Sequence, residues 1–374
     1  MQYRKDRFGN DISMLGYGCM RFTKKGIGTD MEKTEAEILR AVELGINYFD
    51  TAYIYPGSEN SLGQILAKNN LRSKVNIATK LPQYLIRNSE SIEKYFIEQL
   101  SRLQTDYIDY YLMHMLTDID AWNTLKKIGI EEWIKEKKSQ GKIRQIGFSF
   151  HGDSDMFLKI LNAYDWDFCQ IQYNYMDREE QAGDKGVALA TEKGIPLVIM
   201  EPIKGGTLAV LPDEVMEPFR AIRPDASAAS WALRFVASRP IIKVILSGMS
   251  AEEQVADNLN TFTNYEPMTE EELAAVDEVT ARIRARVRNG CTGCRYCMPC
   301  PNGVDIPRNF SVWNKFGMYA NVGSTRWDWS RIPDDAKAKN CVECGACEAA
   351  CPQHLSIREN LATLQAELDA ATAE

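Results

Sequence analysis

Four side chains that can move protons lie at the ends of apolar runs in the first third of the chain. Asp50 closes the run NYFD, and Tyr55 follows five residues later in a loop that contains proline and glycine. Lys80 ends the run VNIATK, and His114 ends the longer run DYIDYYLMH. Apolar-aromatic runs bounded by turn residues are typical of strands. If these strands lie parallel in one sheet, a carboxylate, a phenol, an ammonium and an imidazole meet at one edge.

Each of these residues alone also fits a purely structural role. Tyr55 fits a hydrogen-bonded core tyrosine, Lys80 fits a solvated lysine, and His114 fits a core histidine with satisfied hydrogen bonds. The recurrence of titratable groups at successive strand ends favours a shared chemical role over three separate structural ones.

The elements that must position these residues recur through the first 250 residues. Short apolar runs alternate with helical segments, and the runs lie near residues 14–20, 46–49, 75–79, 107–112, 143–148, 168–171, 196–200 and 242–246. Eight such strands over this length predict an α/β fold, a (β/α)8 TIM barrel, whose active sites lie at the C-terminal strand ends. A doubly wound sheet is the alternative, but the first run reads GYGCMR and lacks the GxGxxG fingerprint.

A change in composition marks the end of the predicted barrel. A last helix is expected from Thr269 to about Arg288, because a capping residue precedes the acidic start TEEEL. Asn289 and Gly290 follow, and then the sequence becomes rich in cysteine. We therefore expect one domain over residues 1–288 and a second over residues 289–374.

The barrel motifs resemble those of the aldo-keto reductases. The stretch FDTAYIY with the SE that follows it, the strand-ending TK and the run ending in His114 match that family in order and separation. The resemblance covers residues 1–288 and implies reduction of a small carbonyl substrate, an aldehyde or ketone, with NAD(P)H. It implies that Tyr55 donates the proton, Lys80 stabilises the phenolate, Asp50 holds the ammonium and His114 orients the carbonyl.

The same resemblance implies positions for the nicotinamide end of the cofactor. Ser149 and Gln170 match residues that bind the nicotinamide amide, although both also fit ordinary strand-end residues. Phe150 stands where the family usually has asparagine, and Met200 stands where many members have an aromatic residue that stacks on the ring. The ring is therefore expected to be held differently or less tightly.

The stretch VILSGMSAEEQVADN resembles the loop and helix that bind the adenosine phosphate. Ser247 and Gln254 stand where a lysine and an arginine are common, so both cations that would neutralise a 2′-phosphate are absent. Because a phosphate needs charge-assisted partners, the pattern favours NAD(H) over NADP(H), or a weakened nicotinamide site. Asn258 keeps the position of an adenine contact.

Eight of the ten cysteines lie in two tight runs, CTGCRYCMPCP and NCVECGACEAACP. The second run matches the bacterial ferredoxin spacing CxxCxxCxxxCP, and the first is one residue shorter before its last cysteine. Two such runs predict two 4Fe-4S clusters. Zinc is the alternative, but it usually takes separated pairs of ligands, often with histidine, and the chain has only three histidines. The predicted ligands are Cys291, Cys294, Cys297, Cys300, Cys341, Cys344, Cys347 and Cys351.

Two-cluster ferredoxins imply that the last cysteine of each run binds the cluster of the other run. By that resemblance, Cys351 joins the first three cysteines of the first run, and Cys300 joins those of the second. The shorter spacing before Cys300 leaves this crossing open. Cys19 and Cys169 lie in strand runs and are expected to be buried apolar residues.

Composition limits the class of partner. A formal charge of −8 argues against a general nucleic-acid or anionic-membrane surface. The N-terminal residues contain no apolar signal segment, and no stretch of 18 apolar residues occurs. We therefore expect a cytoplasmic protein with no nucleic-acid or membrane partner.

Two functions from different classes remain open. In the first, the protein is a carbonyl reductase whose clusters are structural, regulatory or serve a second partner. In the second, it is an electron-transfer protein whose clusters take electrons from a ferredoxin or flavodoxin and pass them to a substrate or a flavin in the barrel. The complete set of Asp50, Tyr55, Lys80 and His114 favours the first function, and the substituted cofactor positions keep the second open.

Overall fold

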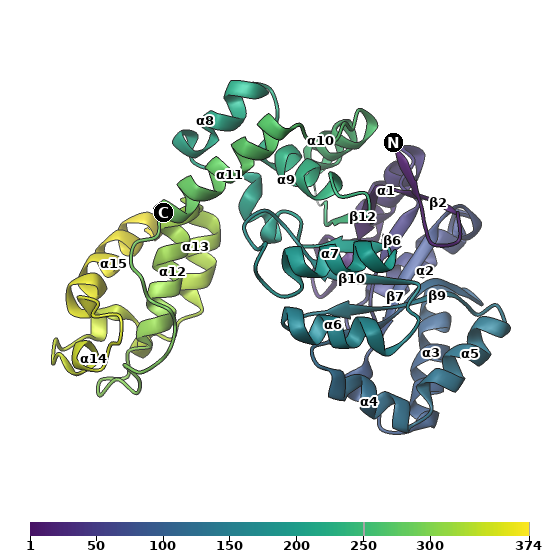
Figure 1. Cartoon of the computed structure of the whole chain (residues 1–374), viewed down its shortest axis with the longest axis horizontal. Coiled ribbons are helices and arrows are strands. Elements are labelled where there is room, and N and C mark those ends of the chain that lie inside the picture. The colour runs from purple at the N-terminus through teal and green to yellow at the C-terminus, as the bar shows by residue number, and fades with distance from the viewer. Residues whose placement is uncertain (250, 374) are drawn as a thin grey trace. The chain divides into compact units, whose positions relative to one another are not determined.

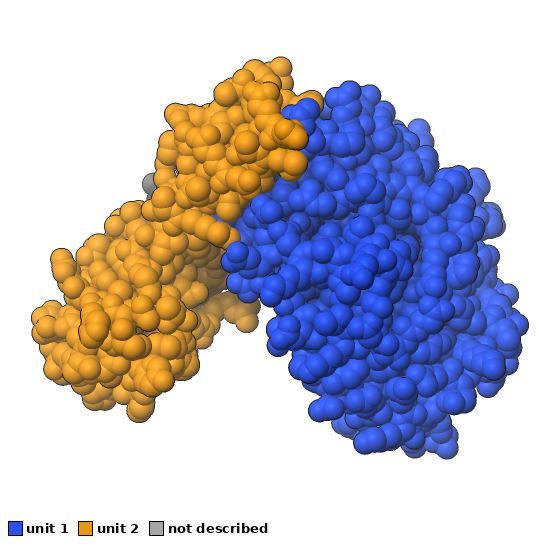
Figure 2. Space-filling view, in the orientation of Figure 1, with its two compact units in different colours: residues 1–204, 229–269 blue, residues 205–228, 270–374 orange. Residues whose placement is uncertain are grey.

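The computed structural model describes residues 1–249 and 251–373, which form two compact units (Figure 2). Unit 1 comprises residues 1–204 and 229–269, and unit 2 comprises residues 205–228 and 270–374. Residues 205–228 and 270–288, which sequence reasoning assigned to the first domain, thus group with unit 2. The domain boundary after residue 288 stays a prediction.

A closed barrel of eight parallel strands forms the centre of unit 1 (Figure 1). The strands follow one another around the barrel in chain order, and the last pairs with the first. They are β3 (Leu15–Gly18), β6 (Tyr48–Asp50), β7 (Asn76–Leu81), β8 (Ile108–Leu116), β9 (Ile143–Phe150), β10 (Phe168–Gln172), β11 (Leu197–Met200) and β12 (Ile242–Ser247). The TIM barrel is confirmed, and the doubly wound sheet is wrong.

Helices follow the strands in unit 1. They are α1 (Met31–Glu43), α2 (Ser58–Lys68), α3 (Ser89–Leu103), α4 (Ile119–Lys127), α5 (Ile130–Ser139), α6 (Ser154–Ala163), α7 (Gly183–Lys193), α9 (Ala228–Ala237) and α10 (Glu252–Thr263). Several begin where the side chain of Asp30, Asn88, Asp118 or Asp153 accepts a hydrogen bond from a backbone N–H of the first turn. Gly57 has a φ of +76°, and this left-handed turn leads from the Tyr55 loop into α2.

The barrel interior is filled by alternate residues of its strands. Side chains in a strand point to opposite faces in turn, so every second residue lies on the inside. The interior core consists of Ile12, Tyr48, Ala78, Tyr110, Leu112, Phe168, Val198, Val244 and Leu246. Ile12 comes from a hairpin that precedes the barrel, formed by β1 (Tyr3–Lys5) and β2 (Asp11–Ser13). A second small hairpin consists of β4 (Lys24–Lys25) and β5 (Gly28–Thr29).

Unit 2 is helical in its described residues. Its helices are α8 (Asp213–Ile222), α11 (Glu270–Ala285), α12 (Ile306–Tyr319), α13 (Val322–Ser330), α14 (Ala346–Ala349) and α15 (Ile357–Thr372). Ion pairs between Arg223 and Glu272 and between Arg282 and Glu217 join α8 to α11. Short 3-10 helices complete the chain: η1 (Cys19–Arg21), η2 (Arg72–Lys74), η3 (Gln83–Leu85), η4 (Lys204–Ala209), η5 (Asp334–Ala336) and η6 (Ala338–Asn340).

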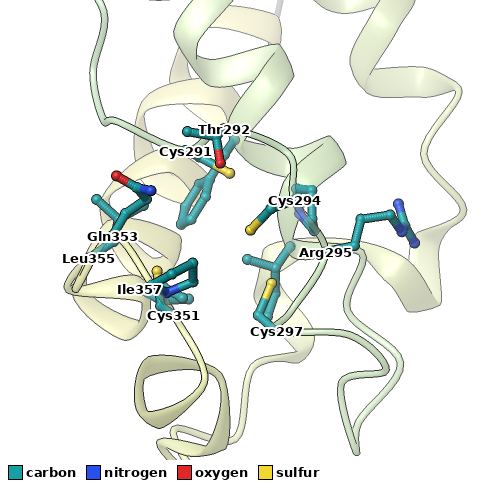
Figure 3. A pocket seen from close by; sticks show the side chains of 13 residues that line it. Cys291, Thr292, Cys294, Arg295, Cys297, Cys351, Gln353, Leu355 and Ile357 are labelled. Atoms are coloured by element: carbon teal, nitrogen blue, oxygen red, sulfur yellow. The ribbon is translucent and has the colours of Figure 1, made fainter.

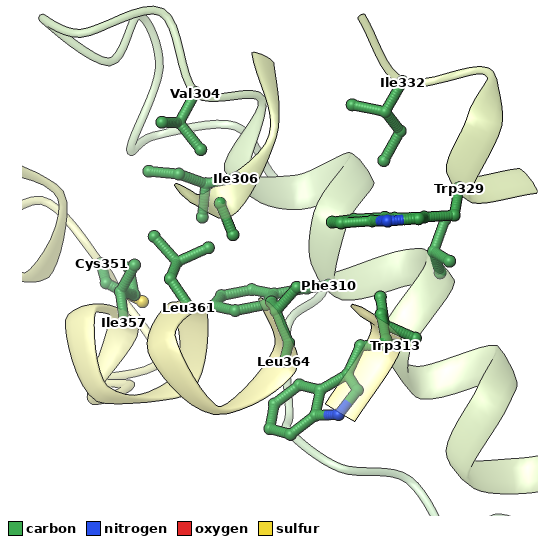
Figure 4. Packing of buried hydrophobic residues seen from close by; sticks show 13 residues of the cluster. Val304, Ile306, Phe310, Trp313, Trp329, Ile332, Cys351, Ile357, Leu361 and Leu364 are labelled. Atoms are coloured by element: carbon green, nitrogen blue, oxygen red, sulfur yellow. The ribbon is translucent and has the colours of Figure 1, made fainter. Parts of the chain in front are cut away.

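A separate apolar core supports the cysteine-rich part of unit 2 (Figure 4). Phe310 and Trp313 of α12 pack with leucines of α15, and the Trp313 indole donates a hydrogen bond to Glu367 at 2.8 Å. Trp329 is also buried there, whereas Trp327 is 63% exposed. Trp327 therefore lies on a face of α13 that is open to solvent. No described helix is long and apolar enough to cross a membrane.

Candidate functional site

Three of the four predicted residues point into the barrel at the C-terminal end of their strands. Each lies two positions after a residue of the interior core, and the period of two places it on the same inner face. The pairs are Tyr48 and Asp50, Ala78 and Lys80, and Leu112 and His114. Tyr55 lies in the loop between β6 and α2, and this loop brings it to the same end of the barrel.

Lys80 is almost completely buried and paired with Asp50. Its Nζ lies 2.7 Å from Asp50 Oδ1 and 2.7 Å from the Thr51 carbonyl oxygen, and only 1% of the lysine is exposed. Burial alone would lower the pKa of Lys80, but the charges of Asp50 and Tyr55 raise it above its ordinary value. The ammonium therefore stays protonated at neutral pH, and the solvated-lysine interpretation is wrong.

Tyr55 is half-buried between the ammonium and the imidazole. Lys80 Nζ lies 5.2 Å from the centroid of the Tyr55 ring, and the His114 ring meets it edge-on at 6.2 Å between centroids. The charge of Lys80 lowers the pKa of Tyr55, but burial and the Asp50 carboxylate outweigh it, so the net pKa is raised. The phenol is therefore protonated at neutral pH, and the nearby ammonium can stabilise a phenolate once the proton has left.

His114 is neutral at physiological pH. Burial, followed by the charges of Lys80 and His151, lowers the pKa of His114 to about 3. Its Nδ1 atom is buried and has no hydrogen-bond partner among the described residues, and the same holds for Asp50 Oδ2. A core histidine with satisfied hydrogen bonds is therefore the wrong interpretation. Buried polar atoms without a partner are rare in folded proteins, and a functional role is one explanation for them.

Ser149 and Gln170 are direct neighbours on adjacent strands. Their Cα atoms are paired in the register of β9 and β10. The Ser149 hydroxyl accepts a hydrogen bond from the Met115 backbone N–H at 2.8 Å, which leaves its own O–H free to donate. Gln170 Oε1 is buried without a partner among the described residues. A hydroxyl and an amide acceptor side by side fit a carboxamide, which carries both a carbonyl and an NH2 group.

Phe150 and Met200, the two substituted positions, differ in their surroundings. Phe150 is fully buried and packs edge-on against Phe157 of α6, 5.1 Å away between ring centroids. Its side chain thus belongs to the strand–helix layer outside the barrel. Met200 is partly exposed at the end of β11 and packs against the interior core. Of the two, only Met200 borders the barrel interior.

The predicted adenosine positions lie on β12 and α10. Asn258 Nδ2 donates a hydrogen bond to Ser247 Oγ at 3.0 Å, and both side chains are buried. Gln254 is exposed on the first turn of α10. No lysine or arginine stands at positions 247 or 254. Ser250, within the same stretch, lies outside the described residues.

The eight clustered cysteines line two small cavities in unit 2. Cys291, Cys294, Cys297 and Cys351 line the first, and Figure 3 shows their sulfur atoms around a common space with Arg295 directed away. The second is lined by Cys300, Cys341, Cys344 and Cys347. The last cysteine of each run thus lies with the first three of the other run, in the crossed arrangement that two-cluster ferredoxins imply.

The spacing of these thiols also bears on the zinc alternative. Among the described residues, no group of three or more His, Cys, Asp or Glu side chains could hold a single metal ion. A zinc ion needs its sulfur ligands within about 2.3 Å of one point. Four soft thiolate donors around a wider space fit a multi-iron cluster better.

Cys19 and Cys169 lie apart from these cavities. Both are fully buried, and burial raises the pKa of each thiol well above its ordinary value. They are neutral apolar residues, as predicted.

Sequence reasoning assigned no role to Glu59, although the SE after Tyr55 is part of the matched motif. Glu59 is 2% exposed, and its carboxylate binds Thr79, Gln99 and Arg102. Tyr84, whose ring lies 6.4 Å from that of His114, was also missed. The available signal for Glu59 was its place in the SE that follows Tyr55 in the matched motif.

Comparison with known proteins gives two family matches. Residues 14–281 match the model of the aldo/keto reductase family, and residues 290–355 match that of a 4Fe-4S dicluster domain. The first match alone covers more than half of the chain.

Individual relatives agree with the first match. The uncharacterized oxidoreductase YqkF of Bacillus subtilis is 28% identical over 315 residues, which cover 74% of this chain and 96% of that protein. The NADH-specific methylglyoxal reductase of Escherichia coli is 28% identical over 267 residues, covering 59% and 80%. The solved holo structure of aldo-keto reductase AKR11C1 from Bacillus halodurans superposes with a TM-score of 0.61 at 26% identity, covering 75% of this chain and 96% of that one.

Proposed function

Because the chain belongs to the aldo/keto reductase family, we propose that it reduces a small aldehyde or ketone with hydride from a nicotinamide cofactor. The family makes it an oxidoreductase, and the 4Fe-4S dicluster domain is its second part. The observation that carries the proposal is the buried ion pair of Lys80 and Asp50 beside Tyr55 at the C-terminal end of the barrel. The relatives named as reductases support the reaction class.

Tyr55 is the proposed proton donor. When bound, the nicotinamide supplies hydride to the carbonyl carbon, and negative charge develops on the carbonyl oxygen. Tyr55 gives its phenolic proton to that oxygen and becomes a phenolate. Lys80 stabilises the phenolate through its nearby charge, while Asp50 and the Thr51 carbonyl hold the ammonium in place.

His114 is proposed to orient the carbonyl. Its imidazole is neutral, so it can donate a hydrogen bond from an N–H without adding a second positive charge beside Lys80. Such a bond would hold the carbonyl oxygen close to Tyr55 and favour transfer of the proton.

Ser149 and Gln170 are proposed to bind the nicotinamide carboxamide. The unpaired Gln170 Oε1 supports this role because it can accept a hydrogen bond from the amide NH2. The neutral Ser247 and Gln254 favour NADH over NADPH, and a relative named as NADH-specific supports that preference. Asn258 is proposed to contact the adenine.

Replacing Tyr55 by phenylalanine tests the proposed reaction. Reduction of methylglyoxal and a panel of small aldehydes would be followed by oxidation of NADH, and then of NADPH, with anaerobically purified protein. We expect Tyr55→Phe to lower kcat/KM by about 10²- to 10⁴-fold, the usual contribution of a positioned acid. Binding of NADH, measured by fluorescence, should change by less than about twofold, because Tyr55 is not a proposed cofactor contact.

Tyr107→Phe is the matched control for that experiment. Tyr107 is a half-buried tyrosine that lies just before the N-terminal end of β8, where its ring faces Arg72 and Arg144. Loss of the Tyr107 hydroxyl should leave carbonyl reduction within about twofold of wild type. If Tyr55→Phe reduces every substrate as fast as wild type, Tyr55 is not the proton donor and the proposal fails.

The two cysteine cavities are proposed to hold two 4Fe-4S clusters. Each cavity offers four thiols, the donor set that such a cluster takes. A cluster supplies one-electron transfer when bound. Thiol ligands persist in a reducing compartment, so we propose a cytoplasmic location and a one-electron partner such as a ferredoxin or flavodoxin.

A second candidate function is electron transfer through a flavin in the barrel. The cysteine cavities favour it, because reduction of a carbonyl by hydride needs no one-electron carrier. The clusters would then pass single electrons to a flavin or directly to a substrate. Titration of the clusters with reduced nicotinamide separates the two functions.

A further inference from the structure

We propose that Glu59, Thr79, Gln99, Arg102 and Tyr111 form a positioning cluster that sets the place of Lys80 relative to Tyr55. We call this set the Glu59 cluster. The inference rests on the proposed function, because it assigns the cluster a purpose in that same site. The cluster lies on the outer side of the barrel wall, between β7, β8, α2 and α3, and touches neither the substrate nor the cofactor position.

The Glu59 carboxylate is the centre of the cluster. Its Oε1 accepts hydrogen bonds from Thr79 Oγ1 and from Gln99 Nε2, both at 2.7 Å. Its Oε2 accepts one from Arg102 Nη1 at 3.2 Å. The carboxylate is therefore compensated on both oxygens, as a buried charge requires. It joins α2, which carries Glu59, to β7 through Thr79 and to α3 through Gln99 and Arg102.

Gln99 links the Glu59 carboxylate to the backbone of Lys80 by hydrogen bonds. The Gln99 NH2 group also donates to the Lys80 carbonyl oxygen at 3.1 Å. The other end of the amide accepts a hydrogen bond from the Tyr111 hydroxyl at 2.7 Å. The Glu59 carboxylate and the Lys80 carbonyl can only accept, so the NH2 group must face them and the amide oxygen faces the Tyr111 hydroxyl. The Lys80 carbonyl is thus held from outside the barrel while its ammonium lies inside.

Arg102 connects the same carboxylate to the loop that carries Tyr55. Its Nη1 atom donates to the Tyr53 carbonyl oxygen at 3.1 Å as well as to Glu59. One carboxylate therefore holds the strand of Lys80 through Thr79 and Gln99, and the loop of Tyr55 through Arg102. The two proposed proton-transfer residues share one anchor.

The strand register makes this arrangement effective. Thr79 and Tyr111 are paired Cα partners on β7 and β8, and both side chains point out of the barrel. Lys80 is the next residue and points inward. A displacement of the β7 backbone at Thr79 would therefore move the ammonium directly, and misplacement by about 1 Å can cost about 100-fold in rate. A buried polar cluster is more costly to form than an apolar contact, so precise placement is a reason for its presence.

Two neighbouring tyrosines of β8 give a matched test. Tyr111→Phe removes the hydroxyl that orients Gln99. Tyr110→Phe removes a hydroxyl that donates to Asp6 at 2.8 Å from the inner face of the same strand. Both are buried and both lose a hydrogen bond, and Tyr110→Phe should lose at least as much stability as Tyr111→Phe, because its acceptor is a carboxylate. We expect Tyr111→Phe to lower kcat about tenfold with KM within twofold, and Tyr110→Phe to leave kcat within twofold.

A second readout does not depend on turnover. With 3-fluorotyrosine at position 55, a ¹⁹F NMR titration reports when this phenol ionises. If the cluster holds Lys80 near Tyr55, Tyr111→Phe and Gln99→Met should move the titration to higher pH, because the ammonium favours the phenolate. Tyr110→Phe should not move the titration of Tyr55. Thr79→Ser keeps the hydroxyl and should titrate close to wild type, whereas Thr79→Val should shift the titration as Tyr111→Phe does.

These two readouts separate the cluster from the proposed reaction. If the wild-type protein reduces no carbonyl, the proposed function fails, and the ¹⁹F titration still tests the positioning of Lys80. If Tyr111→Phe and Tyr110→Phe agree in kcat and in the Tyr55 titration, the cluster is only structural and the inference is wrong.

Discussion

At the scale of single residues, Lys80 and His114 are both buried in the barrel site, but Lys80 stays charged and His114 is neutral. Lys80 keeps its charge because Asp50 compensates it, and removing one partner of such a buried pair commonly costs about 3–5 kcal/mol. His114 has no such carboxylate and stays neutral. The Lys80 ammonium and the neutral His114 imidazole thus lie at one end of the barrel. This combination suits a site that must hold a positive charge and a hydrogen-bond donor together.

The neutral His114 predicts a pH dependence of folding stability. The pKa of histidine is about 6.5 in an unfolded chain, whereas that of His114 in the folded protein is about 3. Between these values the unfolded chain binds the extra proton, so stability falls as pH decreases. From pH 7 to pH 5 the loss due to His114 should be about 2 kcal/mol.

Urea unfolding followed by circular dichroism at pH 7 and pH 5 measures this loss in wild type and in His114→Gln. The variant should lose about 2 kcal/mol less between the two pH values, because glutamine does not titrate. Other acid-sensitive groups, including the clusters, are common to both proteins and cancel in the difference. Equal pH dependence in the two proteins would contradict the neutral His114.

At the scale of elements, the close approach of α2 and α3 decides where Glu59 and Arg102 can meet. A Cβ atom at Gly63 of α2 would lie 2.4 Å from the Arg102 carbonyl oxygen and 2.6 Å from the backbone of Leu103. Backbone atoms cannot move aside as a flexible side chain can. Glycine at this position therefore allows the two helices to approach without strain.

Gly63→Ala should accordingly destabilise the protein by about 1–3 kcal/mol, the usual cost of overpacking. Gly323→Ala in the first turn of α13 is the control, because its Cβ would lie 3.7 Å from the nearest atom. That change should be neutral or stabilise by up to about 1 kcal/mol, since alanine favours the helix. Thermal unfolding measures both variants, and equal stability losses would contradict the close contact.

The crossing of the cysteine runs is also decided between elements. In the crossed arrangement, Cys294→Ala with Cys351→Ala disables one cluster, whereas Cys344→Ala with Cys351→Ala disables both. Anaerobic iron analysis should find about eight iron atoms per chain in wild type, about four in the first double variant and almost none in the second. EPR of the reduced proteins gives an independent count of clusters. The reverse order of the two double variants would show that each run binds its own cluster.

At the scale of the whole molecule, the proposed function places two electron carriers of different kind in one chain. Nicotinamide transfers two electrons as hydride, whereas a 4Fe-4S cluster normally transfers one. Direct exchange between them would need a high-energy nicotinamide radical. We therefore expect the reductase half to work without the clusters unless a flavin divides the electron pair.

An anaerobic titration with NADH and then NADPH, followed by cluster absorbance, tests this independence. No bleaching of the clusters is expected in protein that binds the nucleotide and contains no flavin. Alanine replacement of Cys294 and Cys344 together should remove both clusters and leave carbonyl reduction within about threefold of wild type, because neither residue belongs to the barrel site. Bleaching with a flavin band, and loss of all turnover with the clusters, would favour the electron-transfer function instead.

Much of the fold and the types of residue in the site could be predicted from the sequence, because both follow from short-range patterns. Short apolar runs predict strands, and eight of them alternating with helical segments predict the barrel that the structure confirms. Asp50, Lys80 and His114 each close such a run, so their common end of the barrel follows from the parallel order. The cysteine spacing likewise predicted the 4Fe-4S domain. The catalytic and cofactor-binding roles of these residues stay predictions.

Only the tertiary structure decided the environment of each group. The burial of Lys80, the unpaired Nδ1 of His114 and the outward direction of Phe150 depend on neighbours far away in the chain. The shared anchor at Glu59 requires contacts with α3 and β7, separated from it by 20 to 43 residues. Charge, protonation and position are set by such long-range contacts, because solvent access and hydrogen-bond partners are properties of the packed molecule. A local pattern supplies the residue types, and the packing decides their chemistry.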